Sequence, residues 1–211
     1  MEIRVKYFVR GTVCAVALVA ALTGCGGGGD ADAGAAVGAA GIGSGGEKGK
    51  KTSGTLSVPQ VRSALPTNET LGGVWVGDDL GVIDGEPARQ HCAEETGTPC
   101  DGVVAVGHKE AAVRGNADSD KVEFTLFSFD SQQAASAAVK GLAAKIRNRE
   151  HTPTQVAAGA DETEAFTNGN HGTSVVMRVG NVVAYVRASL YADDGARQMA
   201  LLQVDLIKKA A

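Results

Sequence analysis

Aromatic residues and an excess of positive charge are both lacking in this chain of 211 residues. It has five Phe, three Tyr and one Trp, and its 20 Lys and Arg are outnumbered by 24 Asp and Glu, which gives a formal net charge of −4. Nucleic-acid binding needs clustered basic side chains for the phosphates, and single strands also need aromatic side chains on which bases stack. The composition therefore excludes DNA and RNA as expected partners.

The apolar run near the N-terminus is too short to span a membrane. Residues 12–22 make a run of about 11 residues, whereas a spanning helix needs ~20. Arg4, Lys6 and Arg10 precede the run, and small residues follow it. This is the layout of a secretory signal, with a basic start, a short apolar region and a small-residue cleavage site. We therefore expect residues 1–24 to be a signal peptide.

The end of this segment, Leu22-Thr23-Gly24-Cys25, resembles the lipobox of bacterial lipoproteins. The resemblance implies a diacylglycerol on Cys25, cleavage before it, and an anchor in the cell membrane on its extracytoplasmic side. Two or three acyl chains, at about 0.8 kcal/mol per buried methylene, make a stable anchor where one chain is marginal. The alternative is an ordinary secretory signal that happens to contain a cysteine.

Cysteines are few in the rest of the chain: only Cys92 and Cys100 follow Cys25. Paired cysteines of an exported protein usually form a disulfide, because the compartment is oxidising. The alternative is a metal pair that uses His91, but no further Cys or His follows at ligand spacing. We therefore predict a disulfide.

Residues 25–54 are expected to be the lipidated cysteine followed by a flexible tether. Twelve of the residues 26–54 are Gly, and such a segment cannot bury enough apolar surface to offset its ordering entropy. A flexible coil of this length reaches ~30 Å. Removal of residues 1–24, which carry three basic residues and one acidic residue, changes the formal net charge from −4 to −6.

Residues 55–211 have the length of one domain with its own core. Apolar periodicity and capping residues predict helices at 56–65, 131–147 and 195–209, and strands at 103–106, 111–113 and 122–129. The run 67–102 is interpreted as irregular. In the strand 122–129 the apolar side chains change phase near residue 126, so this strand has either a bulge there or two buried faces.

A hairpin is the clearest local element. Residues 173–179 and 182–190 flank Gly180-Asn181, which suits a two-residue type II′ turn. The order of elements then favours an α+β domain, in which helices pack on one face of an antiparallel sheet.

Several motifs of residues 55–211 recur together in one kind of exported protein. They are Leu-Ser-Val-Pro-Gln-Val-Arg-Ser-Ala-Leu-Pro-Thr, the region around Gly73 and Trp75, Phe127-Ser128-Phe129-Asp130-Ser131, and Val179-Gly180-Asn181-Val182-Val183. The set resembles small actinobacterial lipoproteins and, more remotely, the extracellular sensor domain of PknH-type receptor kinases. The resemblance implies an α+β fold and an extracytoplasmic sensing or binding role, but no residue motif. The sensor domains usually carry two disulfides, whereas this chain can form one.

Catalytic and metal-binding patterns are missing. There is no Gly-x-Ser-x-Gly motif, and the four histidines are widely spread. The run from Asn116 to Asp120 begins like a calcium loop, but Lys121 stands where Gly is expected and Phe127 where Glu is expected. Paired carboxylates could do acid/base work, but we interpret the acidic loop as solvated; it contains Asp78, Asp79, Asp84 and Glu86. We expect no catalytic residue, metal or cofactor.

One face of the predicted hairpin is the candidate binding surface. Arg178, Tyr185 and Arg187 place two cations around an aromatic side chain, an arrangement that can hold an anionic or carbohydrate group; the alternative is an ordinary solvated face. The sequence therefore predicts a non-enzymatic binding or sensing lipoprotein whose partner is an envelope protein or a small ligand. The alternatives are a carrier of a small apolar or lipid ligand, held between helices and sheet, and an enzyme of unknown class.

Overall fold

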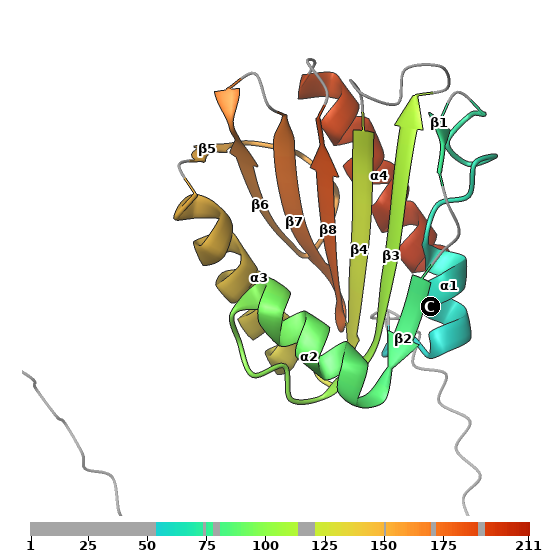
Figure 1. Cartoon of the computed structure of the whole chain (residues 1–211), viewed down its shortest axis with the longest axis vertical. Helices are drawn as coiled ribbons and strands as arrows, with labels where there is room; N and C mark the ends of the chain where they lie inside the picture. The colour runs from blue at the N-terminus through green and yellow to red at the C-terminus, as the bar shows by residue number, and fades with distance from the viewer. Residues whose placement is uncertain are drawn as a thin grey trace, which may run out of the picture. The chain divides into compact units, whose positions relative to one another are not determined.

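The computed structural model contains one antiparallel sheet with helices against both of its faces (Figure 1). It describes residues 54–73, 75–77, 81–113, 121–149, 151–169, 172–189 and 193–211. All of them belong to one compact unit, Lys48–Ala211. The predicted signal peptide, Cys25 and nearly all of the predicted tether lie outside the described residues.

The unit contains four helices and eight strands within its described residues. In chain order they are α1 (Val58–Ala64), β1 (Trp75–Val76), β2 (Gly81–Asp84), α2 (Gly85–Thr96), β3 (Val103–Val113), β4 (Lys121–Phe129), α3 (Gln132–Arg147), β5 (Thr152–Thr154), β6 (Glu162–Thr167), β7 (Thr173–Val179), β8 (Val182–Ala188) and α4 (Asp193–Ala210).

The strands lie in the order β1-β3-β4-β8-β7-β6-β5, and β2 also pairs with β3. The edge of β3 is shared, since β1 pairs with Ala112 and Val113 whereas β2 pairs with residues 105–108. Every pairing is antiparallel. The predicted α+β class with an antiparallel sheet is therefore confirmed.

The predicted hairpin has the expected register. Val179 pairs with Val182, and the pairing continues without a shift to Thr173 and Ala188. Gly180 has a φ of 60°, and Asn181 does not share this positive φ. A type II′ turn requires this combination, because only its first central residue takes a left-handed φ.

Strand β4 has two buried faces rather than a bulge at residue 126. Its pairing with β8 runs without a shift from Val122 to Ser128. Phe124 lies in the apolar cluster that contains α1 and α4, and Phe127 lies in the cluster that contains α2 and α3. The irregularity falls instead in β3, between Val103 and Ala105.

The helices do not all pack on one face, and this part of the fold prediction was wrong. In Figure 1, α2 and α3 lie in front of the sheet and α4 lies behind it. The two apolar clusters divide in the same way, one with α1 and α4 and the other with α2 and α3. All seven residues of β7 are buried, so polar side chains of the central strands are covered as well.

Helix α1 rests directly on β3 because the strand has a glycine under it. A Cβ atom at Gly107 would lie 2.7 Å from Cγ1 of Val61 and 2.8 Å from Cδ1 of Leu65. Carbon atoms do not approach so closely without displacement, so a side chain at residue 107 would force Val61 and Leu65 to shift.

The interpretation of residues 67–102 as irregular was wrong. This run contains β1, β2 and the whole of α2. The buried residues of α2 are Ala88, Cys92 and Thr96, one per turn, which is a much narrower stripe than the apolar face of most surface helices. The predicted strands 103–106 and 111–113 are two parts of the single strand β3.

The described domain begins beside the β7–β8 turn. Asn181 Nδ2 donates to Oγ1 of Thr55 at 3.1 Å. Ser128 Oγ accepts from the backbone N–H of Leu56 and donates to the carbonyl oxygen of the same residue, both at 2.8 Å. The N-terminal segment is therefore fixed at the end of the sheet where β4 ends and β8 begins.

Candidate binding surface on the uncovered half of the sheet

Helices α2 and α3 cover only part of the sheet face on which they pack (Figure 1). On β4 and β8 the side chains of this face become more exposed toward the uncovered end, whereas β7 is buried along its whole length. On β8, Val183 is buried, Tyr185 is half-buried and Arg187 is exposed; β4 follows the same course from Phe127 to Lys121. We call the uncovered part the polar floor, which consists of His108, Glu110, Lys121, Glu123, Tyr185 and Arg187.

Long or exposed contacts, two of them ion pairs and one from His108 to a carboxylate, join the side chains of the polar floor. Lys121 Nζ lies 3.3 Å from Oε1 of Glu110, Arg187 Nη1 lies 3.9 Å from Oε2 of Glu123, and His108 Nδ1 lies 3.8 Å from the other oxygen of Glu123. Such pairs contribute about 0–1 kcal/mol each, because water screens them and long side chains lose entropy on pairing. Little free energy is needed to separate the two side chains of each pair, so a ligand can take the place of one of them.

Two hollows open on the polar floor, and Arg187 lines both. The first has a volume of about 290 Å³, and its lining includes Glu110, Lys121, Glu123, Arg187 and Ser189. The second, which we call the α3 hollow, has a volume of about 130 Å³. It lies against the C-terminal end of α3, and its lining includes Ile146, Arg149, His151, Asn168, Gly172, Thr173, Ser174, Tyr185 and Arg187.

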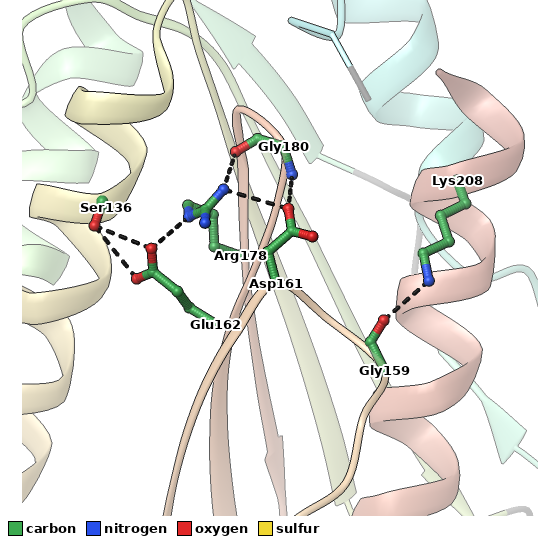
Figure 2. A network of polar contacts seen from close by, with 7 residues as sticks. All are labelled: Ser136, Gly159, Asp161, Glu162, Arg178, Gly180 and Lys208. Carbon is green, nitrogen blue, oxygen red and sulfur yellow. Dashed lines mark hydrogen bonds and ion pairs between the residues drawn. The ribbon is translucent and has the colours of Figure 1, made fainter. Parts of the chain in front are cut away.

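Arg178 does not belong to this open surface. Its side chain is only 6% exposed. The guanidinium group donates from Nε to Oε1 of Glu162 at 2.8 Å, and from Nη1 to the carbonyl oxygen of Gly180 at 2.9 Å and to Oδ2 of Asp161 at 3.3 Å (Figure 2). The sequence placed Arg178 on an exposed hairpin face because it did not show that α3 covers that part of the sheet.

The partners of Arg178 extend the network to a helix and to the hairpin turn. Ser136 Oγ on α3 donates to both carboxylate oxygens of Glu162, at 3.2 and 3.3 Å, and the backbone N–H of Gly180 donates to Oδ2 of Asp161 at 2.8 Å (Figure 2). The network therefore ties β6, the β7–β8 turn and α3 together. Sequence reasoning missed both acidic residues, because β6 has three polar residues followed by two apolar ones and so lacks the alternation that signals a strand.

Tyr185 and Arg187 do lie together, at the α3 hollow. The hydroxyl groups of Tyr185 and Ser174 are 3.3 Å apart. Burial raises the pKa of Tyr185 above its usual value of 10.0, although the hydrogen bond with Ser174 and the charge of Arg187 act in the opposite direction. Tyr185 is therefore uncharged at physiological pH. Arg149 and His151, neither of which the sequence identified as a site residue, stand beside this pair in place of Arg178.

The other residues considered from the sequence are scattered. Cys92 and Cys100 form the predicted disulfide, with their Cα atoms 6.0 Å apart. His91 stacks on Phe127 with ring centroids 6.5 Å apart, and Glu86 pairs with Arg89. Asp78, Asp79, His171 and the calcium-like run 116–120 lie outside the described residues.

Neither a metal cluster nor a membrane-spanning helix occurs in the part of the chain that the structure describes. No three His, Cys, Asp or Glu side chains there come together as a set of metal ligands. None of the described helices has both the length and the apolar character required to cross a bilayer.

Comparison with protein-family models finds no match, and neither does comparison with curated sequences. A search of solved structures finds the extracellular domain of PknH from Mycobacterium tuberculosis. It is 16% identical to this chain, with a TM-score of 0.52, and the match covers 74% of this chain and 98% of that one. The two proteins therefore share a fold, which supports the remote resemblance inferred from the sequence motifs.

Proposed function

We propose that this protein is a lipid-anchored extracytoplasmic lipoprotein that binds or senses an envelope component through its polar floor. The observation that carries the proposal is the floor itself, a part of the sheet that α2 and α3 leave uncovered and whose charged side chains are weakly paired. The fold shared with the extracellular domain of PknH supports an extracytoplasmic location. Under this proposal the partner is an envelope protein or a small ligand.

The position of the N-terminal segment supports the proposal geometrically. Thr55 lies beside the turn before β8, whereas Arg187 lies near the other end of that strand. Seven residues of strand extend for about 23 Å. With an anchor at Cys25, the polar floor would lie at the end of the domain remote from its attachment point, where a partner can reach it.

The polar floor does not have the geometry of a hydrolytic triad. His108 Nδ1 lies 3.3 Å from Oγ1 of Thr125 and 3.8 Å from Glu123. A triad needs the hydroxyl and the carboxylate on opposite ring nitrogens, so that one orients the ring while the other accepts the proton. Here both contacts are made by the same nitrogen, so a binding role is favoured over this kind of catalysis.

The carrier hypothesis gains no support from α3. The small residues that suggested room for an apolar ligand include Ala135, Ala138 and Ala143, and they are buried in one cluster with Leu142 and Phe166. Side chains of the protein itself therefore pack against this stripe.

The anchor is tested on the full chain in a bacterium that processes lipoproteins. We expect globomycin to block maturation, and mass spectrometry to find acyl chains on the N-terminal Cys25 of the mature protein. Cys25→Ala should release the protein from the membrane fraction. A mature chain with an unmodified Cys25 would overturn the anchor.

The binding surface is tested by photo-crosslinking in intact cells. In one variant a photoreactive residue replaces Lys121 on the polar floor. In the control it replaces Arg197, an exposed residue of α4, the helix that packs on the opposite face of the sheet. We expect a discrete adduct from position 121 that Arg187→Ala weakens, and no such adduct from position 197. Equal adducts from both positions, or no adduct from position 121, would reject the polar floor as a binding surface.

A further inference from the structure

We infer that the α3 hollow binds the anionic group, a phosphate or a carboxylate, of a small polar ligand. This inference rests on the proposed binding function and names the chemistry of its ligand. Three observations carry it: the sign of the charges in the hollow, the weak pairing of its arginines, and the hydroxyl groups at its base.

The charges of the α3 hollow have one sign. Its described lining includes the two cations Arg149 and Arg187 but no Asp or Glu. The neighbouring hollow differs, because Glu110 and Glu123 balance its basic residues. A concave site lined by one sign of charge concentrates counter-ions, since its low-dielectric walls focus the field. Glu150 lies outside the described residues.

The two arginines of the hollow have weak acidic partners or none among the described residues, so a ligand can bind them. Arg187 has a side chain that is 65% exposed, and its carboxylate contact with Glu123 is 3.9 Å long. Among the described residues no acidic side chain pairs with Arg149. A guanidinium group presents parallel N–H donors that match two oxygens of a carboxylate or phosphate. An incoming anion therefore displaces little to bind both arginines.

Neutral donors surround the cations. Tyr185 and Ser174 contribute hydroxyl groups, Asn168 contributes an amide, and all three line the hollow. The strands β7 and β8 hold two of these groups in place, because the hydroxyls of Ser174 and Tyr185 are paired at 3.3 Å. Hydroxyl groups held by the sheet beside exposed arginines are suited to an anionic group that carries further polar substituents, such as a saccharide phosphate or a uronate.

The test is a titration of the full chain, purified in detergent, followed by two-dimensional ¹H–¹⁵N NMR. Inorganic phosphate and acetate are the two probes, and glucose is the neutral control. We expect saturable chemical-shift changes at Gly172, Thr173 and Tyr185 with phosphate, with acetate or with both. The probe that binds more tightly then shows whether the ligand's anionic group is a phosphate or a carboxylate. Glucose alone should leave these signals unchanged.

Matched variants separate the site from general charge effects. Arg149→Ala together with Arg187→Ala should weaken binding at least tenfold, whereas Arg197→Ala on α4 should change it less than twofold. If the double alanine variant does not fold, the double variant Arg149→Lys with Arg187→Lys replaces it. The lysines keep the positive charge but lack the parallel N–H donors of a guanidinium group, so binding should weaken measurably.

The inference is overturned if neither probe gives saturable shifts, if the double variant binds as the wild type does, or if Arg197→Ala weakens binding equally. In those cases an adduct from position 121 would still support the polar floor as a binding surface, and only the anionic ligand would be rejected. Loss of the adduct as well would reject the proposed function.

Discussion

Arg178 and Arg187 lie on neighbouring strands of one hairpin and on the same face of the sheet, yet their surroundings are opposite. The side chain of Arg178 is 6% exposed and that of Arg187 is 65% exposed. Arg178 makes close contacts with two carboxylates and a carbonyl oxygen, whereas Arg187 has one carboxylate at 3.9 Å. The covering helix, and not the strand sequence, therefore separates a structural arginine from an available one.

The two ends of the sheet differ in the same way. The end near Gly180 holds the Arg178 network, the Cys92–Cys100 disulfide and the contacts of Leu56 with Ser128. The end near Arg187 holds the polar floor and its two hollows. Stability is therefore expected to depend on the first end and binding on the second.

The strongest test of this comparison replaces each arginine by alanine. Arg178→Ala should lower the free energy of unfolding by about 3 kcal/mol, because it leaves Glu162 and the carbonyl of Gly180 without their cation in a largely covered site. Arg187→Ala should lower it by less than about 0.5 kcal/mol, as for other exposed pairs. Urea unfolding of the full chain measures both. Equal losses would remove the distinction.

The disulfide should give a slightly smaller effect. Replacing Cys92 and Cys100 by alanine opens a loop with a sequence separation of 8, and the chain-entropy estimate for a loop this short is about 2.6 kcal/mol. Reduced wild type should show the same loss. NMR signals of Tyr185 and Gly172 should stay unchanged in the folded variant, and a shift there would show that the two ends are coupled.

Tyr185 should make stability depend on alkaline pH. Its pKa is higher in the folded protein than the usual 10.0, chiefly because of burial, so the folded state holds the phenolic proton more tightly than the unfolded state does. This stabilisation is complete below pH 10 and is lost as the pH rises through the folded pKa. Between pH 9 and 11 the free energy of unfolding should therefore fall more steeply for the wild type than for Tyr185→Phe. Parallel curves would contradict the raised pKa.

The smallest expected effect is that of Glu123→Gln on the binding of anions by Arg187. Glu123→Gln removes the carboxylate that lies 3.9 Å from this arginine, and an exposed pair of this kind contributes a few tenths of a kcal/mol. Phosphate should therefore bind the α3 hollow roughly twofold more tightly in the NMR titration. Weaker binding in this variant would show that Glu123 helps to position Arg187 and does not compete for it.

The local elements were largely predictable from the sequence. The hairpin register follows from the turn at Gly180-Asn181 and the valine-rich runs on either side of it. Helix α3 begins where a serine can cap it, since Ser131 Oγ accepts from Ala134 N–H at 3.3 Å. Helix α2 was missed because a stripe of Ala, Cys and Thr gives a weak apolar signal. The strand β6 was missed together with Asp161 and Glu162, so the ion pairs of Arg178 could not be foreseen.

The candidate site could be predicted only in part. Tyr185 and Arg187 were expected on one face of the hairpin, and they lie there together. Arg149 and His151 come from a different part of the chain, and nothing in their local sequence indicates that the end of α3 brings them to β8. The strand pattern places Arg178 on the same face as the exposed Arg187. Its burial depends on α3, which lies 31 to 46 positions earlier in the sequence.

The sequence by itself determined the lipobox-like segment, the cysteine pair, the turn and the alternation of the strands, because each depends on residues close together in the chain. Only the tertiary structure decided which faces of the sheet are covered, since covering depends on where helices from distant segments pack. That packing buries Arg178, which pairs with two partly exposed carboxylates, and leaves Arg187 at an open hollow, although both arginines occupy the same face of one hairpin.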